Sequence, residues 1–192
     1  GDGCIRGLYL VPYVAPVIAV AFAWVILFDP FSGSINALLV QMGVVETPIN
    51  FFGQKPYALI MVTVFEIWRY FPLSFLFILA RMQAIDVEMY EAADMDGASP
   101  FQIFWYLSLP TLMGILSILF LLRFIWTFNK FDDIFLLTGG SANTRTLTVN
   151  VYEQAFAVSN IGAGSAVAVV IFIFLLFFSI FFFRYLNREE GL

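Results

Sequence analysis

Four long apolar stretches constrain this chain more than any other feature of its sequence. They cover residues 8–28, 57–82, 110–136 and 163–184, and each is long enough to cross about 30 Å of hydrocarbon as a helix. Helices satisfy their backbone polar groups internally, as a lipid environment requires. Hydrophobic residues make up 61% of the chain and charged residues 12%, whereas soluble domains carry about 25% charged residues. The sequence therefore predicts an all-α, polytopic membrane protein.

The composition argues against several other classes of protein. Histidine is absent and Cys4 is the single cysteine, so neither a metal site nor a disulfide framework is expected. The net charge of −5 argues against nucleic acid as a partner. The chain has no G-x-x-x-x-G-K-[ST] phosphate loop and no nucleophile–base constellation. We therefore expect neither an enzyme nor a cofactor bound by this chain.

The polar segment 84–109 joins the second and third apolar stretches and predicts an elbow of two short helices. Asp86 is placed to cap a helix over 87–96, which Gly97 ends. Ser99 and Gln102 form the capping box of a second helix, and Pro110 is expected to stop that helix and to start the next one, which enters the membrane. The first helix is acidic and the second aromatic. This elbow is either a docking surface for another protein or an amphipathic loop on lipid headgroups, and its acidity disfavours the lipid surface.

Several residues of this elbow resemble the EAA loop in permease subunits of bacterial ABC importers, especially those of the maltose and glycerol-phosphate type. The matching residues are Glu91, Ala92, Ala93, Asp96, Gly97, Ala98, Ile103, Leu109 and Pro110. The resemblance implies a type I ABC importer transmembrane fold, as one domain over residues 1–192. It also implies that the first elbow helix is a coupling helix seated in a cytoplasmic ATPase, with Glu91 facing a basic residue. Such permeases have six or more membrane helices, so this chain, which begins GDGCIRG, is expected to lack the first ones.

Ionisable side chains inside the apolar stretches are costly in lipid and indicate a buried environment or a water-filled path. Glu66 and Arg69 lie three residues apart on one helix face, as a structural ion pair or as part of a pathway. Arg123, Thr127 and Lys130 share a face of the next stretch. We expect that face to contact other helices or water rather than lipid.

The resemblance implies that these two stretches line a substrate site. Carried over by position, the lining consists of Tyr70, Leu73, Arg123, Trp126, Thr127 and Lys130. Aromatic rings and hydroxyl groups suit a sugar ligand. The maltose type has small or amide residues where this chain has Arg123 and Lys130. These cations therefore either bind an anionic sugar or pair with the carboxylates of Glu66, Asp132 and Asp133.

The distribution of basic residues predicts the orientation in the membrane. If the elbow lies inside, the basic residues on the inner side are Arg6, Arg81, Arg184 and Arg188, against Lys55 and Arg145 outside. This excess agrees with the positive-inside rule. The C-terminus is then expected in the cytoplasm, and residues 29–56 and 138–162 are expected to form outer loops.

Together, the residues and the resemblance predict the permease subunit of an ATP-driven importer in a bacterial cytoplasmic membrane. The subunit would move a sugar or related polyol by alternating access. Expected partners are a cytoplasmic ATPase dimer holding ATP and Mg, a second homologous permease and an outer solute-binding protein. Two alternatives stay open. One is an ion- or proton-coupled secondary transporter that titrates Glu66, Asp132 and Asp133; the other is an ABC permease for amino acids or ions.

Overall fold

The fold is a layer of long helices with a short-helix elbow at one end. The computed structural model describes the backbone of residues 2–189 and the side chains of residues 7 and 9–186. Arg6 and Arg188, which are expected on the inner side of the membrane, lie outside the residues whose side chains the structure describes. Every regular element of the described residues is helical. Three helices are long and apolar enough to cross a membrane: residues 57–83, 100–128 and 161–186.

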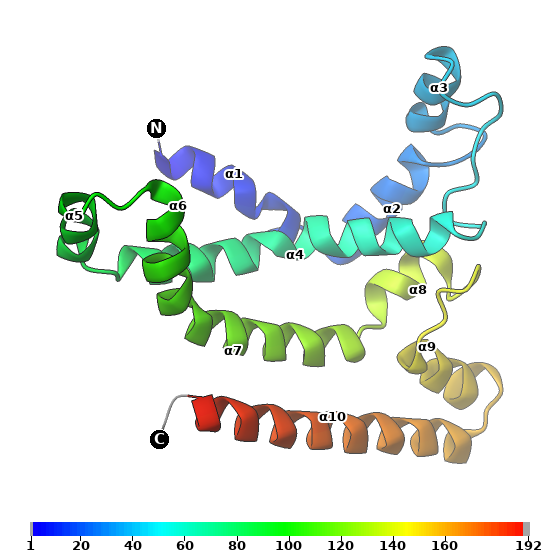
Figure 1. Cartoon of the computed structure of the whole chain (residues 1–192). Helices are drawn as coiled ribbons and strands as arrows, with labels where there is room; N and C mark the ends of the chain where they lie inside the picture. The colour runs from blue at the N-terminus through cyan, green and yellow to red at the C-terminus, as the bar shows by residue number, and fades with distance from the viewer. Residues whose placement is uncertain (1, 190–192) are drawn as a thin grey trace.

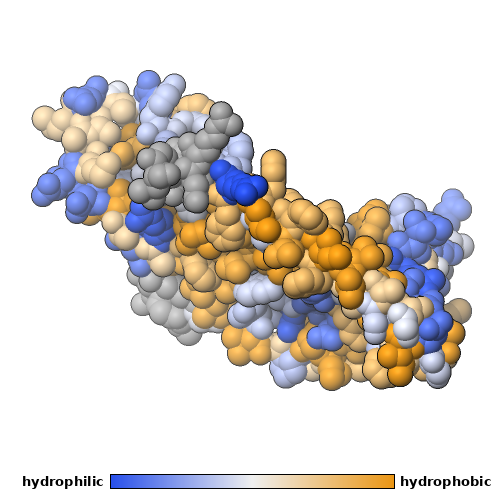
Figure 2. Space-filling view, turned by 90° about the horizontal axis from the view of Figure 1, so that it is seen from below, coloured by the Kyte–Doolittle hydropathy of each residue, from blue (hydrophilic) through white to orange (hydrophobic). Residues whose placement is uncertain are grey.

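These long helices run side by side, and the shorter elements gather at their two ends (Figure 1). Helix α4 (Tyr57–Gln83) packs between α1 (Asp2–Val14) on one side and α7 (Leu109–Phe128) on the other. Helix α10 (Ile161–Glu189) packs against α7. The elbow helix α5 (Val87–Met95) lies at one end, and α3 (Ser34–Gln41) lies at the opposite end (Figure 1). Figure 2 shows a hydrophobic band across the middle of one face, with hydrophilic side chains toward both ends.

The first apolar stretch is not the single helix predicted over 8–28. It is divided into α1 and α2 (Val17–Leu27), which are separated at Ala15 and Pro16. Proline has no N–H, so Pro16 leaves the carbonyl of Pro12, four residues earlier, without its helical donor. The guanidinium of Arg69 on α4 supplies donors instead, at 3.2 Å from the Pro12 oxygen and 3.0 Å from the Ala15 oxygen. The break is therefore stabilised by a side chain far away in the sequence.

The third apolar stretch also ends earlier than the predicted residue 136. Helix α7 stops at Phe128, and the chain turns before α8 (Asp132–Thr138) begins. The Asn129 side chain donates to the Ile125 carbonyl at 3.0 Å, in addition to the backbone N–H of Asn129 at 3.1 Å. Gly139 and Gly140 form the turn after α8, with positive φ of 59° and 78°. The turn leads through α9 (Leu147–Tyr152) and the π-helical turn η2 (Glu153–Ala157) to α10.

The elbow has the predicted caps but one wrong boundary. Gly97 has φ of 73° after α5, and Ser99 and Gln102 form both bonds of the capping box of α6 (Pro100–Ile103). Asp86 occupies the N-cap position of α5 without a side-chain capping bond. Pro110 does not stop the second helix, which runs on through the π-helical turn η1 (Phe104–Ser108) into α7. The N–H of Leu109 donates to Phe104, five residues back, and this wider turn accommodates the proline ring in the next turn.

Hydrogen bonds made by the side chains of Asn36 and Asp29 order the end opposite the elbow. Asn36 is 2% exposed and binds the backbone of residues 28, 29 and 49 through four hydrogen bonds. Backbone hydrogen bonds from Ser32 and Phe31 hold the pKa of the Asp29 carboxyl below its ordinary value. A hydrophobic core lies beneath, where α2, α4, α8 and α9 meet; it consists of Ala21, Val62, Phe65, Ile134, Leu137 and Val149.

The small residues at the start of α10 pack closely against η2 and α9, as their size predicts. Gly164 is buried, and a Cβ built on it would lie 3.1 Å from the Ala155 Cβ and 3.2 Å from the Val151 carbonyl oxygen. A larger residue would therefore push α10 away from this end of the layer.

Candidate functional site

A cleft of about 590 Å³ between α4 and α7 is the candidate solute site. The lining residues of α4 recur at helical spacing, so that one face of the helix forms most of the wall. They combine hydroxyl groups, aromatic rings and one charge pair: Thr63, Glu66, Ile67, Tyr70, Phe71, Ser74, Phe75 and Ile78 from α4, with Arg123 and Thr127 from α7.

Charged side chains from three segments meet at this cleft. Glu66 Oε2 on α4 lies 3.7 Å from Arg123 Nη2 on α7. Glu66 Oε1 lies 3.9 Å from Lys130 Nζ, which in turn lies 2.8 Å from Asp133 Oδ2 on α8. Asp133 is fully buried, and the other three side chains are 16–24% exposed. The alternating signs form one network that joins α4, α7 and α8.

Tyr70 lies at the centre of this network. Its ring centroid is 4.3 Å from the Arg123 guanidinium carbon and 4.1 Å from Lys130 Nζ, within cation–π range. Its hydroxyl donates to Asp133 at 3.2 Å and accepts a hydrogen bond from Lys130. Tyr70 therefore fixes the positions of both cations and of one carboxylate.

The ion pair predicted between Glu66 and Arg69 is wrong. Arg69 is 7% exposed and donates to the Pro12 and Ala15 carbonyls, while Glu66 pairs across to Arg123 and Lys130. Spacing by three residues places both side chains on one side of α4. The break between α1 and α2 presents unpaired carbonyl groups to Arg69, and these compete for its donors.

The predicted pathway residues take different places around the cleft. Tyr70, Arg123 and Thr127 line it, and Lys130 bonds to Tyr70 beside it. Leu73 and Trp126 fall outside the lining. Sequence reasoning missed Thr63, Phe71 and Ser74. Their spacing from Glu66 and Tyr70 was the signal that could have found them, because all five project from one broad face of α4. The roles of these residues in transport stay predictions.

The elbow offers a second candidate surface. A groove of about 430 Å³ is lined by residues of α5, the turn at Gly97, α6 and η1: Ala93, Asp96, Gly97, Ala98, Gln102, Ile103, Tyr106 and Leu107. Glu91 and Ala92 lie exposed on α5, and Pro110 lies beyond the groove in the first turn of α7. Met95, 89% exposed, and Tyr106, 82% exposed, leave apolar surface next to the acidic residues. Such an exposed mixture suits contact with another protein.

One hydrogen bond ties α5 to the long helix. The Tyr90 hydroxyl lies 3.1 Å from the Ser108 hydroxyl in η1, and Ser108 is 5% exposed. From Ser108 the helix continues without interruption to Arg123 and the charge network. The elbow and the candidate solute site are therefore connected through one helix.

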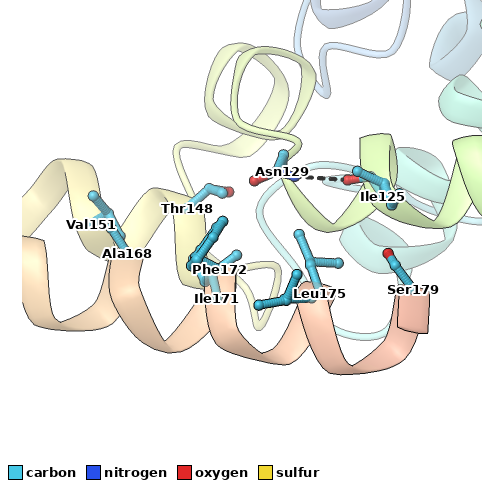
Figure 3. Close-up of a pocket in the computed structure, with 10 residues that line it drawn as sticks. Ile125, Asn129, Thr148, Val151, Ala168, Ile171, Phe172, Leu175 and Ser179 are labelled. Carbon is cyan, nitrogen blue, oxygen red and sulfur yellow. Dashed lines mark hydrogen bonds between the residues drawn. The ribbon is translucent and has the colours of Figure 1, made fainter. Parts of the chain in front are cut away.

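A groove of about 460 Å³ lies between α7, α9 and α10 (Figure 3). Its walls are mostly apolar, with polar groups from Asn129, Thr148 and Ser179. Asn129 already donates to Ile125 (Figure 3), and Thr148 donates to the carbonyl of Lys130. Because Asn129 and Thr148 already donate to backbone carbonyl groups, we place the solute site in the cleft between α4 and α7.

Comparison with known proteins agrees with this architecture. The sequence is 39% identical over 169 residues to the inner membrane ABC transporter permease protein YcjO of Escherichia coli, covering 88% of this chain and 57% of that protein. It is 32% identical over 185 residues to the trehalose/maltose transport system permease protein MalF of Thermococcus litoralis, covering 96% and 62%. It is 30% identical over 193 residues to the sn-glycerol-3-phosphate transport system permease protein UgpA of Agrobacterium fabrum, covering 98% and 64%.

The fold matches that of a chain in the crystal structure of a bacterial alginate ABC transporter in complex with an alginate pentasaccharide-bound periplasmic protein. The TM-score is 0.88 at 19% identity, over 98% of this chain and 65% of that chain. This chain spans 57–64% of the length of the three relatives named above. The family model for the binding-protein-dependent transport system inner membrane component matches residues 1–190. The chain therefore belongs to this family, the permease subunits of ABC importers, and has their type I fold.

Proposed function

We propose that the chain is the membrane-spanning part of an ATP-driven importer that moves a sugar or related polyol across a bacterial cytoplasmic membrane. The observation that carries the proposal is the continuity of one helix, residues 100–128. It begins in the exposed, acidic elbow and reaches the charged cleft at Arg123. A force applied at the elbow would therefore act on the helix that lines the cleft.

The elbow is the proposed contact with the ATPase. Glu91, Ala92, Ala93, Asp96, Gly97 and Ala98 lie on α5 and on the turn that follows it. The acidic groups of this surface fit a basic cleft on the partner. ATP and Mg would be held and hydrolysed by the partner dimer. Binding of ATP would change the access of the cleft only if it favours one arrangement of the helices over the other.

The remaining partners follow from family membership and from the two ends of the layer. A second homologous permease would complete the solute path against the exposed faces of α7 and α10. An outer solute-binding protein would contact residues 29–56 and 138–162. The C-terminus would then lie in the cytoplasm, at the end of the layer where α5 lies (Figure 1). The names of relatives, which mention trehalose, maltose and glycerol 3-phosphate, support a sugar or polyol as the solute.

Purification in mild detergent from native membranes, with the complete protein as bait, tests the proposal. Mass spectrometry should recover an ATPase, a second permease and a solute-binding protein. A Glu91→Lys variant should lose the ATPase but keep the second permease, because only the elbow is changed. Repeated recovery of the protein alone would contradict the importer and favour an ion-coupled transporter that works without an ATPase.

A further inference from the structure

We propose that the cleft between α4 and α7 accepts an uncharged sugar or polyol and rejects its carboxylated or phosphorylated counterpart. This inference rests on the proposed function, because it assigns a solute class to the same cleft. The presence of two cations would ordinarily point to an anionic ligand. The carboxylates that face these two cations favour an uncharged ligand instead.

Each cation at the cleft already faces a carboxylate of this chain. Arg123 lies 3.7 Å from Glu66, and Lys130 lies 2.8 Å from Asp133. With both carboxylates ionised, the two cations and two carboxylates sum to zero net charge. Arg69, the next cation along α4, is committed to the carbonyls of Pro12 and Ala15. No unmatched positive charge among the described residues therefore faces the cleft.

The pair of Lys130 and Asp133 is held in place and cannot readily open for an anion. Asp133 is fully buried and bonds to Lys130 and to the Tyr70 hydroxyl. Both cations pack within 4.3 Å of the Tyr70 ring centroid. An anionic ligand that approached Arg123 would lie next to the Glu66 carboxylate, and two like charges at close range repel. Displacing Glu66 would leave a poorly hydrated carboxylate without its cation.

An uncharged polyol finds complementary groups on the same walls. Glu66 lines the cleft, but both of its carboxylate oxygens are buried, so the hydroxyl groups of a ligand would meet the hydroxyl groups of the walls instead. Thr63, Ser74 and Thr127 add hydroxyl groups. Phe71 and Phe75 add aromatic surface, on which the apolar faces of a sugar ring can pack. The cleft thus offers hydrogen bonds and stacking without net charge.

The test is ligand binding to the complete transporter in nanodiscs, without its solute-binding protein, so that the selectivity of that protein plays no part. The probes are two matched pairs: maltose with maltobionate, and glycerol with glycerol 3-phosphate. At least one uncharged probe should bind about tenfold or more tighter than its anionic counterpart, since like-charge contacts disfavour the anion. Equal or tighter binding of the anion, or failure of both uncharged probes to bind, overturns the inference.

Two variants assign the selectivity to the charge pair. Glu66→Gln keeps the side-chain size and leaves Arg123 unmatched, so the preference for the uncharged probe should fall about tenfold. Arg123→Gln should preserve or increase that preference, because the carboxylate is then left unmatched. The control is Glu153→Gln, which changes the ion pair with Arg145 away from the cleft and should leave the ratio unchanged. A ratio that stays the same in both cleft variants overturns the inference.

ATP-driven uptake is measured on the same preparations and separates the two claims. Selective binding without ATP-driven uptake would contradict the proposed function and leave the assignment of the cleft intact. ATP-driven uptake of the anionic probe in preference to its uncharged counterpart would support the importer and contradict the assignment.

Discussion

At the scale of single residues, the charge network depends on Asp133, the charged group with the least exposure in the described chain. It holds Lys130 at 2.8 Å and accepts from Tyr70 at 3.2 Å. Its neighbour Asp132 is exposed. The two adjacent aspartates therefore offer a direct comparison between a buried ion-pair partner and a solvated carboxylate.

Asp133→Asn should destabilise the protein strongly. The change removes the partner of a half-buried ammonium group, and breaking a buried ion pair costs about 3–5 kcal/mol. Thermal melting in detergent should show a large decrease in Tm for Asp133→Asn and little change for Asp132→Asn. Similar Tm values for the two variants would contradict the ion-pair geometry.

The sequence indicated that ionisable groups would meet inside the protein, because their cost in lipid requires it. It offered Glu66, Asp132 and Asp133 as partners of Arg123 and Lys130, and the structure confirms Glu66 and Asp133. It did not decide between Arg69 and α7 as the partner of Glu66. Glu66 could pair with Arg69 on its own helix or across to α7, and both arrangements satisfy helical spacing. The choice depends on the break at Pro16, whose unpaired carbonyls engage Arg69. Such competition between distant segments has no signal in local spacing.

At the scale of elements, Arg69 stabilises the separation of α1 from α2. Arg69→Met keeps much of the apolar stem and removes both guanidinium donors, so the carbonyls of Pro12 and Ala15 lose their partners. Unsatisfied buried groups cost about 1–3 kcal/mol each. Limited proteolysis should cut near residues 12–17 faster in this variant than in the wild type. Arg81→Met, in the last turn of the same helix, is the matched control and should leave cleavage at 12–17 unchanged.

Tyr90 and Ser108 should transmit movement of the elbow to α7. Tyr90→Phe removes one hydrogen bond, worth about 1 kcal/mol, and should lower solute uptake per ATP hydrolysed while the elbow still binds its partner. Ser108→Ala should have the same effect, and the double variant should be no worse than either. Tyr57→Phe, at the first residue of α4 and away from the elbow, also removes one hydroxyl group and is the control. Additive losses in the double variant would contradict a shared contact.

The helices themselves could be predicted from apolar periodicity and caps, and their interruptions could not. Pro110 was expected to end a helix, since proline usually does so. The π-helical turn at 104–108 allows the helix to continue instead. Helix α7 ends at Phe128 although the predicted helix continued to residue 136. The charged groups of Lys130 and Asp133, beyond this end, pair with each other.

At the scale of the whole molecule, α5 lies at one end of the layer (Figure 1), and the helix of residues 100–128, which follows α5 along the chain, contributes Arg123 and Thr127 to the cleft. The resemblance of the elbow residues indicated the family, and the match of the family model to residues 1–190 confirms it. The resemblance also implied six substrate-lining residues, of which three line the cleft. The match in fold gives the path of the helices, whereas the side-chain contacts at the cleft are properties of this chain's own residues.

Glu91→Lys should prevent coupling between the ATPase at the elbow and the solute site. The variant reverses a charge on the exposed face of α5, so membrane insertion and Tm should stay unchanged while stimulation of the ATPase by solute is lost. Glu91→Asp, which keeps the negative charge, is the control and should retain stimulation. Normal stimulation in Glu91→Lys would contradict the role of the elbow.

The most direct test of the central claim is uptake into proteoliposomes that contain the complete transporter and its solute-binding protein. Uptake should require ATP on the side of the elbow and should continue when ionophores remove the membrane potential and the proton gradient. Uptake that persists without ATP and stops with the ionophores would contradict the account and identify an ion-coupled transporter.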